Sequence, residues 1–167
     1  MLNMLKNNML GSKTEEGFFK KVKGADGKSE ILSLNLETLE YGPRVKAKFQ
    51  SLEMAKSEDN LGKRIKMLFN ANDKAGDFYR AHFLSLMAYV SNRVPEISDE
   101  VYRLDDALKA GFGYEMGPFE TWDAIGFEEG LNALKKEGMA YSPWIDTMHE
   151  KGAKSFYRIE DGKRQFW

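Results

Sequence analysis

Residues 111–126, with the sequence GFGYEMGPFETWDAIG, decide how the second half of the chain is interpreted. Gly111 follows an amphipathic run, and a glycine in that place is typical of a helix C-terminus. Gly117 and Pro118 predict a turn into a new helix, because proline suits the first helical position. We expect that helix to end at Gly126 and to present one apolar face, made of Phe119, Trp122 and Ile125.

Helical spacing of apolar residues extends upstream of this stretch. Residues 76–93 form the longest such segment, and Pro95 ends it because proline disfavours a helical residue before it. The apolar positions of this segment are Tyr79, Phe83, Leu86, Met87, Val90 and Val94. Ser98 is expected to cap a helix over residues 99–109, whose first two residues are acidic, as the helix dipole favours.

Further helices are expected on both flanks. Ser51 is placed to cap a helical segment that continues to Phe69, and the polar residues 70–74 break it. The helices expected downstream are residues 127–136 and 142–150. The sequence therefore predicts a mainly α fold, a helical bundle with short β-hairpins.

The two hairpins are expected near the ends of the chain. Residues 18–23 and 29–36 flank Asp26 and Gly27, and an Asp-Gly pair between two apolar runs is typical of a hairpin turn. Residues 155–167 predict the second hairpin, with its turn at 160–162. Each hairpin begins with an aromatic pair and carries Asp-Gly-Lys, which indicates a weak internal repeat in which a hairpin closes each helical unit.

The composition of the chain excludes several kinds of function. Its 25 Lys and Arg residues balance 26 Asp and Glu, which argues against nucleic-acid binding because phosphate contacts need a concentrated positive field. The chain has no cysteine, which excludes disulfides, thiolate metal sites and a cysteine nucleophile and favours a cytoplasmic location. The most apolar run, residues 83–90, is far shorter than the roughly 20 residues that span a membrane.

The titratable residues give no catalytic constellation. His82 lies beside Phe83 in an apolar segment, so we expect a packing role rather than a general base, and His149 is expected at the surface near a helix end. Adjacent residues of a helix do not face each other, so neighbouring carboxylates are expected on solvated faces rather than in catalytic dyads. These pairs are Asp105 with Asp106 and Glu128 with Glu129.

The remaining motifs also have structural explanations. The glycines of residues 111–113 lack a preceding strand and the Lys-Ser/Thr ending of a phosphate loop. Met116, Phe119 and Trp122 are expected in the core, and the lysines of residues 20–23 are typical of a protected strand edge. The residues themselves therefore predict no catalytic, cofactor-binding or metal site in this chain.

Residues 107–126 resemble the signature of the C-terminal helical domain of 3-hydroxyacyl-CoA dehydrogenases. That pattern has a helix ending in a glycine-rich turn, then Met-Gly-Pro, an apolar residue and an aspartate. The matching positions, expected to be structural, are Gly111, Phe112, Gly113, Met116, Gly117, Pro118, Phe119, Trp122 and Asp123. Residues 10–19 are similar to the Gly-x-Lys-Thr-x-x-Gly-Phe-Tyr segment that ends such a domain.

The order of the two motifs is reversed relative to a single domain, and larger members of the family carry two copies in tandem. The resemblance therefore implies that residues 1–36 are the end of a first helical copy plus its β-hairpin. Residues 37–50 are then a linker, irregular over 44–50, and residues 51–167 form a second helical domain. It also implies that the chain is part of a longer polypeptide.

The family oxidises 3-hydroxyacyl-CoA to 3-ketoacyl-CoA with NAD in fatty-acid β-oxidation. Its nucleotide-binding fold lies N-terminal to the helical domain and has no counterpart in this sequence, so NAD is expected on an upstream domain of the same polypeptide. The family's Asn-Arg pair corresponds here to Tyr79 and Arg80, while Asn92 and Arg93 lie at the wrong end of the helix. The resemblance thus implies a chain that is inactive in isolation.

Several roles remain open for such a chain. The helical domain can wall the acyl-CoA cleft, pack within the enzyme or mediate self-association. Acyl-CoA could also bind directly, with phosphates on the lysines and the acyl chain in an apolar groove. The residues of that hypothesis are Lys20, Lys21, Lys23, Phe78, Phe83 and Met87. The alternative outside this family is a free-standing helical protein-interaction module without enzymatic role.

Overall fold

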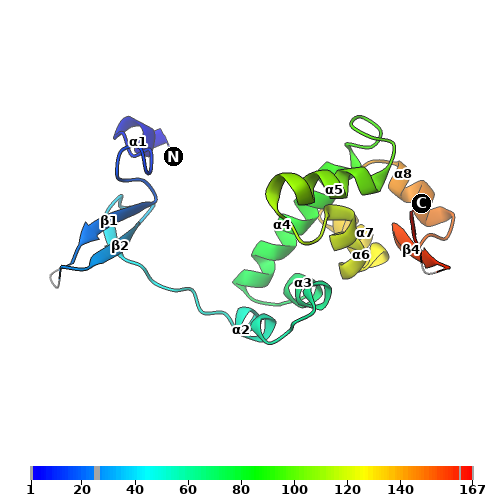
Figure 1. Cartoon of the computed structure of the whole chain (residues 1–167), viewed down its shortest axis with the longest axis horizontal. Helices are drawn as coiled ribbons and strands as arrows, with labels where there is room; N and C mark the ends of the chain where they lie inside the picture. The colour runs from blue at the N-terminus through cyan, green and yellow to red at the C-terminus, as the bar shows by residue number, and fades with distance from the viewer. Residues whose placement is uncertain (1, 25–26, 162, 167) are drawn as a thin grey trace. The chain divides into compact units, whose positions relative to one another are not determined.

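The computed structural model describes residues 2–24, 27–161 and 163–166. The chain divides into two compact units, Met1–Ala47 and Lys48–Trp167, and each is described by itself (Figure 1). The boundary between them falls within residues 44–49, which have no regular secondary structure, as the sequence predicted. The domain limits 1–36, 37–50 and 51–167 stay a prediction.

The first unit holds α1 (Leu2–Lys6) and an antiparallel sheet of β1 (Phe19–Lys23), β2 (Ser29–Leu34) and β3 (Tyr41–Pro43) in the order β1-β2-β3. The predicted hairpin of β1 and β2 is confirmed, although Ala25 and Asp26 of its turn lie outside the described residues. Strand β3 lies in the expected linker and was not predicted from the sequence. Tyr41 explains it, because this residue pairs with Leu34 and its hydroxyl donates to the Gly17 carbonyl at 2.6 Å.

The second unit is mainly helical, as predicted. Its helices are α2 (Gln50–Lys56), α3 (Leu61–Phe69), α4 (Lys74–Ser91), α5 (Val101–Phe112), α6 (Pro118–Ile125), α7 (Phe127–Lys136) and α8 (Trp144–Glu150). The antiparallel strands β4 (Tyr157–Glu160) and β5 (Lys163–Phe166) follow as the predicted second hairpin, while Gly162 of its turn and Trp167 lie outside the described residues. Helix α6 contacts α3, α4, α5 and α7, so it lies at the centre of this unit.

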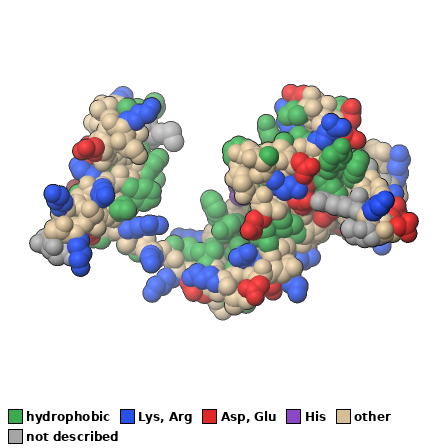
Figure 2. Space-filling view, in the orientation of Figure 1, with side chains coloured by type: hydrophobic (Ala, Val, Ile, Leu, Met, Phe, Trp, Pro, Cys, Tyr) green, Lys and Arg blue, Asp and Glu red, His purple; other side chains and the backbone are tan. Residues whose placement is uncertain are grey.

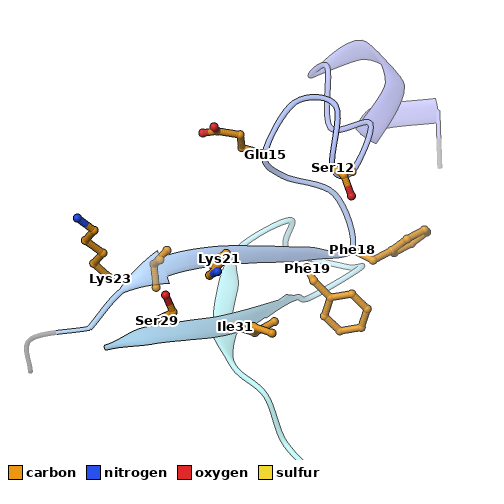
Figure 3. Close-up of a pocket in the computed structure, with 10 residues that line it drawn as sticks. Ser12, Glu15, Phe18, Phe19, Lys21, Lys23, Ser29 and Ile31 are labelled. Atoms are coloured by element: carbon orange, nitrogen blue, oxygen red, sulfur yellow. The ribbon is translucent and has the colours of Figure 1, made fainter. Parts of the chain in front are cut away.

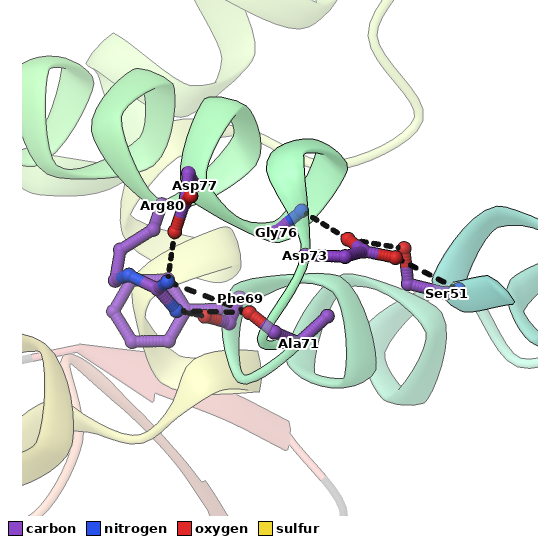
Figure 4. Close-up of polar contacts among 7 residues, drawn as sticks. All are labelled: Ser51, Phe69, Ala71, Asp73, Gly76, Asp77 and Arg80. Atoms are coloured by element: carbon purple, nitrogen blue, oxygen red, sulfur yellow. Dashed lines mark hydrogen bonds and ion pairs between the residues drawn. The ribbon is translucent and has the colours of Figure 1, made fainter. Parts of the chain in front are cut away.

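The predicted helix from Ser51 to Phe69 is in fact two helices. Asn60 begins the second of them, since its side chain accepts a hydrogen bond from the Lys63 amide at 2.9 Å. Ser51 is not a cap but lies inside α2, where its hydroxyl donates to Asp73 at 2.9 Å. Asp73 in turn caps α4 by accepting from the Gly76 amide, and these bonds, that of Gly76 first, lower the pKa of its carboxyl group (Figure 4).

Arg80 fixes the connection between α3 and α4. Its guanidinium donates to the carbonyl oxygens of Phe69, the last residue of α3, and of Ala71, and it forms an ion pair with Asp77 at 2.8 Å (Figure 4). A helix C-terminus leaves carbonyl groups without intrahelical partners, and a cation satisfies them well. The Arg80 side chain therefore stabilises the end of α3 and the start of α4.

Two helix boundaries differ from the prediction. Helix α5 begins at Val101 rather than after Ser98, whose hydroxyl instead accepts from the Glu100 amide ahead of the helix. Gly111 does not end α5 either. The helix continues to Phe112, and Gly113 ends it with a φ of 68°, a left-handed conformation that glycine adopts without strain.

The core of the second unit is built around Phe156, which begins the C-terminal hairpin and is fully buried. Its ring contacts four other aromatic rings, with centroid distances of 4.8, 5.1, 5.2 and 6.0 Å to Phe119, Trp122, Phe127 and Trp144. The hairpin is thus held by helices α6, α7 and α8 together, and aromatic pairs of this kind add to the free energy of area burial.

Replacing Phe156 by alanine tests this arrangement. We expect Phe156→Ala to lower the free energy of unfolding by about 3–5 kcal/mol, because it leaves a cavity among four rings. The matched control is Phe112→Ala, the same substitution at a side chain that is 70% exposed, with an expected change below about 0.5 kcal/mol. Urea unfolding followed by tryptophan fluorescence measures both, and equal effects would contradict the proposed core.

Candidate functional site

The signature stretch is organised by a buried carboxylate, that of Asp105 on α5, which is 1% exposed. Its Oδ1 accepts a hydrogen bond from the Phe119 amide at 2.8 Å, and its Oδ2 accepts from the Glu120 amide at 3.0 Å. The hydroxyl of Tyr157 donates to the same Oδ2 at 2.8 Å. The expectation that Asp105 lies on a solvated face is therefore wrong, whereas its neighbour Asp106 is exposed, as expected.

The two amides are those of the second and third residues of α6, which an N-terminal capping side chain normally satisfies. The capping position of α6 is Gly117, which has no side chain to offer. Asp105 supplies the missing carboxylate from the neighbouring helix. A Cβ atom at Gly117 would lie 2.3 Å from the Cβ of Asp105, so only glycine leaves room for this carboxylate.

Burial raises the pKa of the Asp105 carboxyl group, because the charged form loses hydration inside the protein. The three hydrogen bonds that it accepts, from Phe119 first and then from Tyr157 and Glu120, oppose this rise by favouring the carboxylate. The positive end of the α6 dipole favours the negative charge in the same place. The free-energy cost of removing the Asp105 carboxylate from water is therefore opposed by its hydrogen bonds to the N-terminus of α6.

A second carboxylate supports the same turn from outside. The Oε2 atom of Glu120 accepts from the Gly117 amide at 2.6 Å, and its Oε1 receives Lys109 Nζ at 3.1 Å. Lys109 also pairs with Asp106 at 3.0 Å, and these contacts, that of Asp106 first, raise the pKa of its ammonium group. The turn between α5 and α6 is thus fixed by charged hydrogen bonds on both of its sides.

Asp123 connects the middle of α6 to the C-terminal hairpin. Its Oδ1 accepts from the Phe156 amide at 2.8 Å, and its Oδ2 accepts from the Tyr157 amide at 2.9 Å. These are the two residues whose side chains reach the aromatic core and Asp105, respectively. Asp105 and Asp123 together therefore form a seat for the hairpin, which we call the hairpin seat, with the aromatic rings of Phe119, Trp122, Phe127 and Trp144.

The other signature residues differ in burial. Phe119 and Trp122 are fully buried and Met116 is partly buried against the same core. Phe112 is 70% exposed, and its ring stacks on Tyr114 at a centroid distance of 5.7 Å. The exposed aromatic residues of this turn take no part in the hairpin seat, and their role stays a prediction.

Of the two histidines, His149 lies beside the hairpin seat, with its ring centroid 6.2 Å from that of Phe127, and His82 lies on α4. His82 is exposed and does not pack in the core. Its ring stacks on that of Phe78 at the surface, with a centroid distance of 6.4 Å. His149 is exposed, as expected. Glu128 is exposed, and Glu129 pairs with Lys66 at 3.1 Å. Within the described residues, no group of three or more His, Asp and Glu side chains could hold a metal ion.

The structure does not support the acyl groove that the sequence suggested for direct acyl-CoA binding. Met87 is 1% exposed in the helical core, so it cannot line an open groove, although Phe78 is exposed. The lysines of that hypothesis lie on β1, in the other unit. In the described part of the chain, no helix is both long enough and apolar enough to cross a membrane.

Residues 82–158, which hold the residues of the hairpin seat, are similar to the C-terminal domain of 3-hydroxyacyl-CoA dehydrogenases. The sequence model of the family described as "3-hydroxyacyl-CoA dehydrogenase, C-terminal domain" matches residues 82–158, a range that includes Asp105, the signature and Phe156. The resemblance inferred from the sequence is therefore confirmed.

Homology extends beyond this range. The chain is 38% identical, over 97% of its length, to the Bacillus subtilis protein named "Probable 3-hydroxyacyl-CoA dehydrogenase". It is 27% identical, over 80% of its length, to a Rickettsia prowazekii protein named "Putative fatty acid oxidation complex trifunctional enzyme", and 26% identical, over 96%, to a Rickettsia felis protein of the same name. The chain spans 20%, 17% and 20% of these relatives, respectively. No solved structure matches the chain significantly.

Replacing Asp105 by asparagine tests the buried cap. We expect Asp105→Asn to lower the free energy of unfolding by about 1–3 kcal/mol at neutral pH, because an amide NH₂ cannot accept the second helix N–H bond. Asp106→Asn is the matched control, since it makes the same change on the exposed neighbouring residue, and we expect it to have little effect. Equal losses in the two variants, measured by chemical unfolding, would show that Asp105 does not cap α6.

We also expect the stability difference between the wild type and Asp105→Asn to depend on pH. Because the folded protein raises the pKa of Asp105 above its unfolded value, the contribution of this group is fully present below the unfolded pKa and is lost as pH rises through the folded pKa. The stability advantage of the wild type over Asp105→Asn should therefore shrink as pH rises from about 4. Taking the difference between the two proteins cancels the other carboxylates, and an advantage that grows with pH would contradict the raised pKa.

Proposed function

We propose that this chain is the C-terminal helical part of an NAD-dependent 3-hydroxyacyl-CoA dehydrogenase of fatty-acid β-oxidation. The observation that carries the proposal is the 38% identity to the Bacillus subtilis protein over 97% of the chain. The match of residues 82–158 to the family's C-terminal domain supports it, because the hairpin seat lies inside this range. NAD then belongs to an upstream nucleotide-binding domain of the same polypeptide, and the helical part walls the acyl-CoA cleft or joins two copies.

A replacement within the Bacillus subtilis relative tests this proposal. We expect the relative to keep its dehydrogenase activity within about tenfold when its matching segment is exchanged for this chain, because the two are 38% identical over 97% of this chain. NADH consumption with acetoacetyl-CoA measures the activity. We expect this chain alone to consume NADH no faster than buffer without protein. The control is the same exchange carrying Phe156→Ala, which disrupts the hairpin seat.

The outcomes are distinct. An exchanged protein that folds, binds NADH and yet has no activity would overturn the proposed function. A rate from the chain alone, proportional to its concentration, would overturn the assignment of NAD to another domain.

We further propose that the outer face of α4 mediates self-association. Phe78, His82, Ser85 and Tyr89 recur at spacings of four, three and four residues, so they share one face of the helix. Phe78 is 67% exposed and Tyr89 is 60% exposed, which leaves a wide aromatic surface on this face. Large exposed apolar patches are typical of protein interfaces.

Sedimentation measures this association directly. We expect the wild-type chain to form a concentration-dependent dimer, and Phe78→Ser with Tyr89→Ser to weaken it at least tenfold without changing the unfolding midpoint at concentrations where both proteins are monomeric. The control is Phe112→Ser, which removes a comparably exposed aromatic ring from α5. A chain that stays monomeric at all concentrations, or a dimer that tolerates the double substitution, would contradict the proposal.

A further inference from the structure

Three short segments of the chain each carry three basic residues. They are Lys20, Lys21 and Lys23 on β1, Arg44, Lys46 and Lys48 after β3, and Lys63, Arg64 and Lys66 on α3. Figure 2 shows Lys and Arg side chains on both units. The three segments offer similar side chains, so they differ chiefly in the backbone that carries them. We call residues 44–48 the basic connection.

Hydrogen bonds hold the backbone of two of these segments. Strand β1 pairs with β2 along its whole length, and Lys21 and Lys23 project from this paired strand (Figure 3). Asn60 caps α3, and the helix continues to Phe69. A peptide bond in either segment can enter the active site of a protease only after the strand or helix has unfolded locally.

The backbone of the basic connection has no such support. The segment belongs to neither a helix nor a strand, and each of its residues is exposed. Within the described part of the chain, the backbone amides and carbonyl groups of residues 45–48 form no hydrogen bond. Even the apolar side chain of Val45 is 88% exposed. An extended segment with free amides and carbonyl groups can bind another protein as an added β-strand.

The side chains of the basic connection alternate in type. Val45 and Ala47 separate the three basic residues, which are Arg44, Lys46 and Lys48. Successive side chains of an extended chain point to opposite sides, so the basic side chains share one side when the segment is extended. A serine protease of the trypsin type uses a carboxylate in its specificity pocket to select Lys or Arg. The basic connection therefore offers such a protease three suitable side chains on an unpaired backbone.

Two other exposed lysines lie in turns that hydrogen bonds close. In the loop that contains Lys13, the Gly11 amide donates to the Glu16 carbonyl at 2.8 Å. In the β1–β2 turn, the Lys28 carbonyl accepts from the Gly24 amide at 2.7 Å. These bonds must break before either turn can extend, so we expect a protease to cut both turns later than the basic connection.

We infer that the basic connection is the cleavage site of this chain for a protease that selects Lys or Arg, and that the cut leaves the second unit folded. The C–N bond that follows one of the three basic residues breaks, and water supplies a hydroxyl group to the carbonyl carbon and a proton to the nitrogen. The hydrogen bonds and ring contacts of the hairpin seat all join residues beyond Lys48, so the cut removes none of them. The inference goes beyond the proposed dehydrogenase, because it requires no redox activity.

Limited digestion of the full chain with trypsin tests the inference. Intact-mass spectrometry at successive times identifies the fragments, and we expect the first pair to be divided after Arg44, Lys46 or Lys48. A variant that combines Arg44→Gln, Lys46→Gln and Lys48→Gln removes all three cleavage points. We expect it to lose intact chain about tenfold more slowly than the wild type, because every remaining cut requires local unfolding.

The matched control makes the same change on α3. Lys63→Gln, Arg64→Gln and Lys66→Gln together remove equally many basic residues from a segment of similar length. The ion pair of Lys66 with Glu129 is partly exposed and contributes little stability, so its loss should not open the helix. We expect this variant to be digested at the rate of the wild type within about twofold, because its basic connection is intact.

Tryptophan fluorescence reports whether the second unit stays folded after the cut. The three tryptophans of the chain, Trp122, Trp144 and Trp167, all belong to this unit. We expect the cut protein, once the trypsin is inhibited, to keep the emission spectrum and the unfolding midpoint of the intact chain.

Three results would overturn the inference. The first is a wild-type chain whose first cut lies outside the basic connection. The second is a glutamine variant of the basic connection that folds like the wild type and is digested as fast. The third is a loss of the native tryptophan emission when the basic connection is cut. None of these readouts depends on NADH consumption, so they are independent of the test of the proposed function.

Discussion

The structure of the second unit depends on one buried carboxylate, that of Asp105. It accepts the second and third amides of α6 from a neighbouring helix, because the capping residue of α6, Gly117, has no side chain. An ionised group without these bonds would be costly in the interior, so the carboxylate and the helix N-terminus are stable only together. This requirement fixes how closely α5 and α6 approach, since the backbone of Gly117 packs directly against Asp105.

The position of α6 then determines the rest of the core. The helix contacts four other helices and supplies both Phe119 and Trp122 to the aromatic cluster. It also carries Asp123, which binds the backbone at the start of the C-terminal hairpin. The hairpin returns a hydroxyl group, that of Tyr157, to Asp105 itself. A closed circuit of hydrogen bonds thus joins α5 and α6 to a hairpin whose bonded residues lie 33 to 52 residues further along the chain.

Local patterns in the sequence predicted the elements of this circuit but not the interactions that close it. Pro118 and Gly126 gave the correct limits of α6, because proline and glycine act on the backbone within one turn. Asp105 was misplaced, since its partners lie 14, 15 and 52 residues away and no helical periodicity reports them. A signal was present in Gly117, a helix-capping position without a capping side chain, which requires an acceptor from elsewhere. Strand β3 was missed for a similar reason, since Tyr41 pairs with β2 and bonds Gly17 across 24 residues.

The two hairpins show how far local sequence can determine burial. Both begin with an aromatic pair and form antiparallel strands, so the repeated sequence specifies the same local structure twice. Yet Phe156 is fully buried and Phe18 is 49% exposed. Hydrophobic burial is a property of the surfaces that meet and not of the segment alone, so the same local sequence can be buried in one unit and exposed in the other.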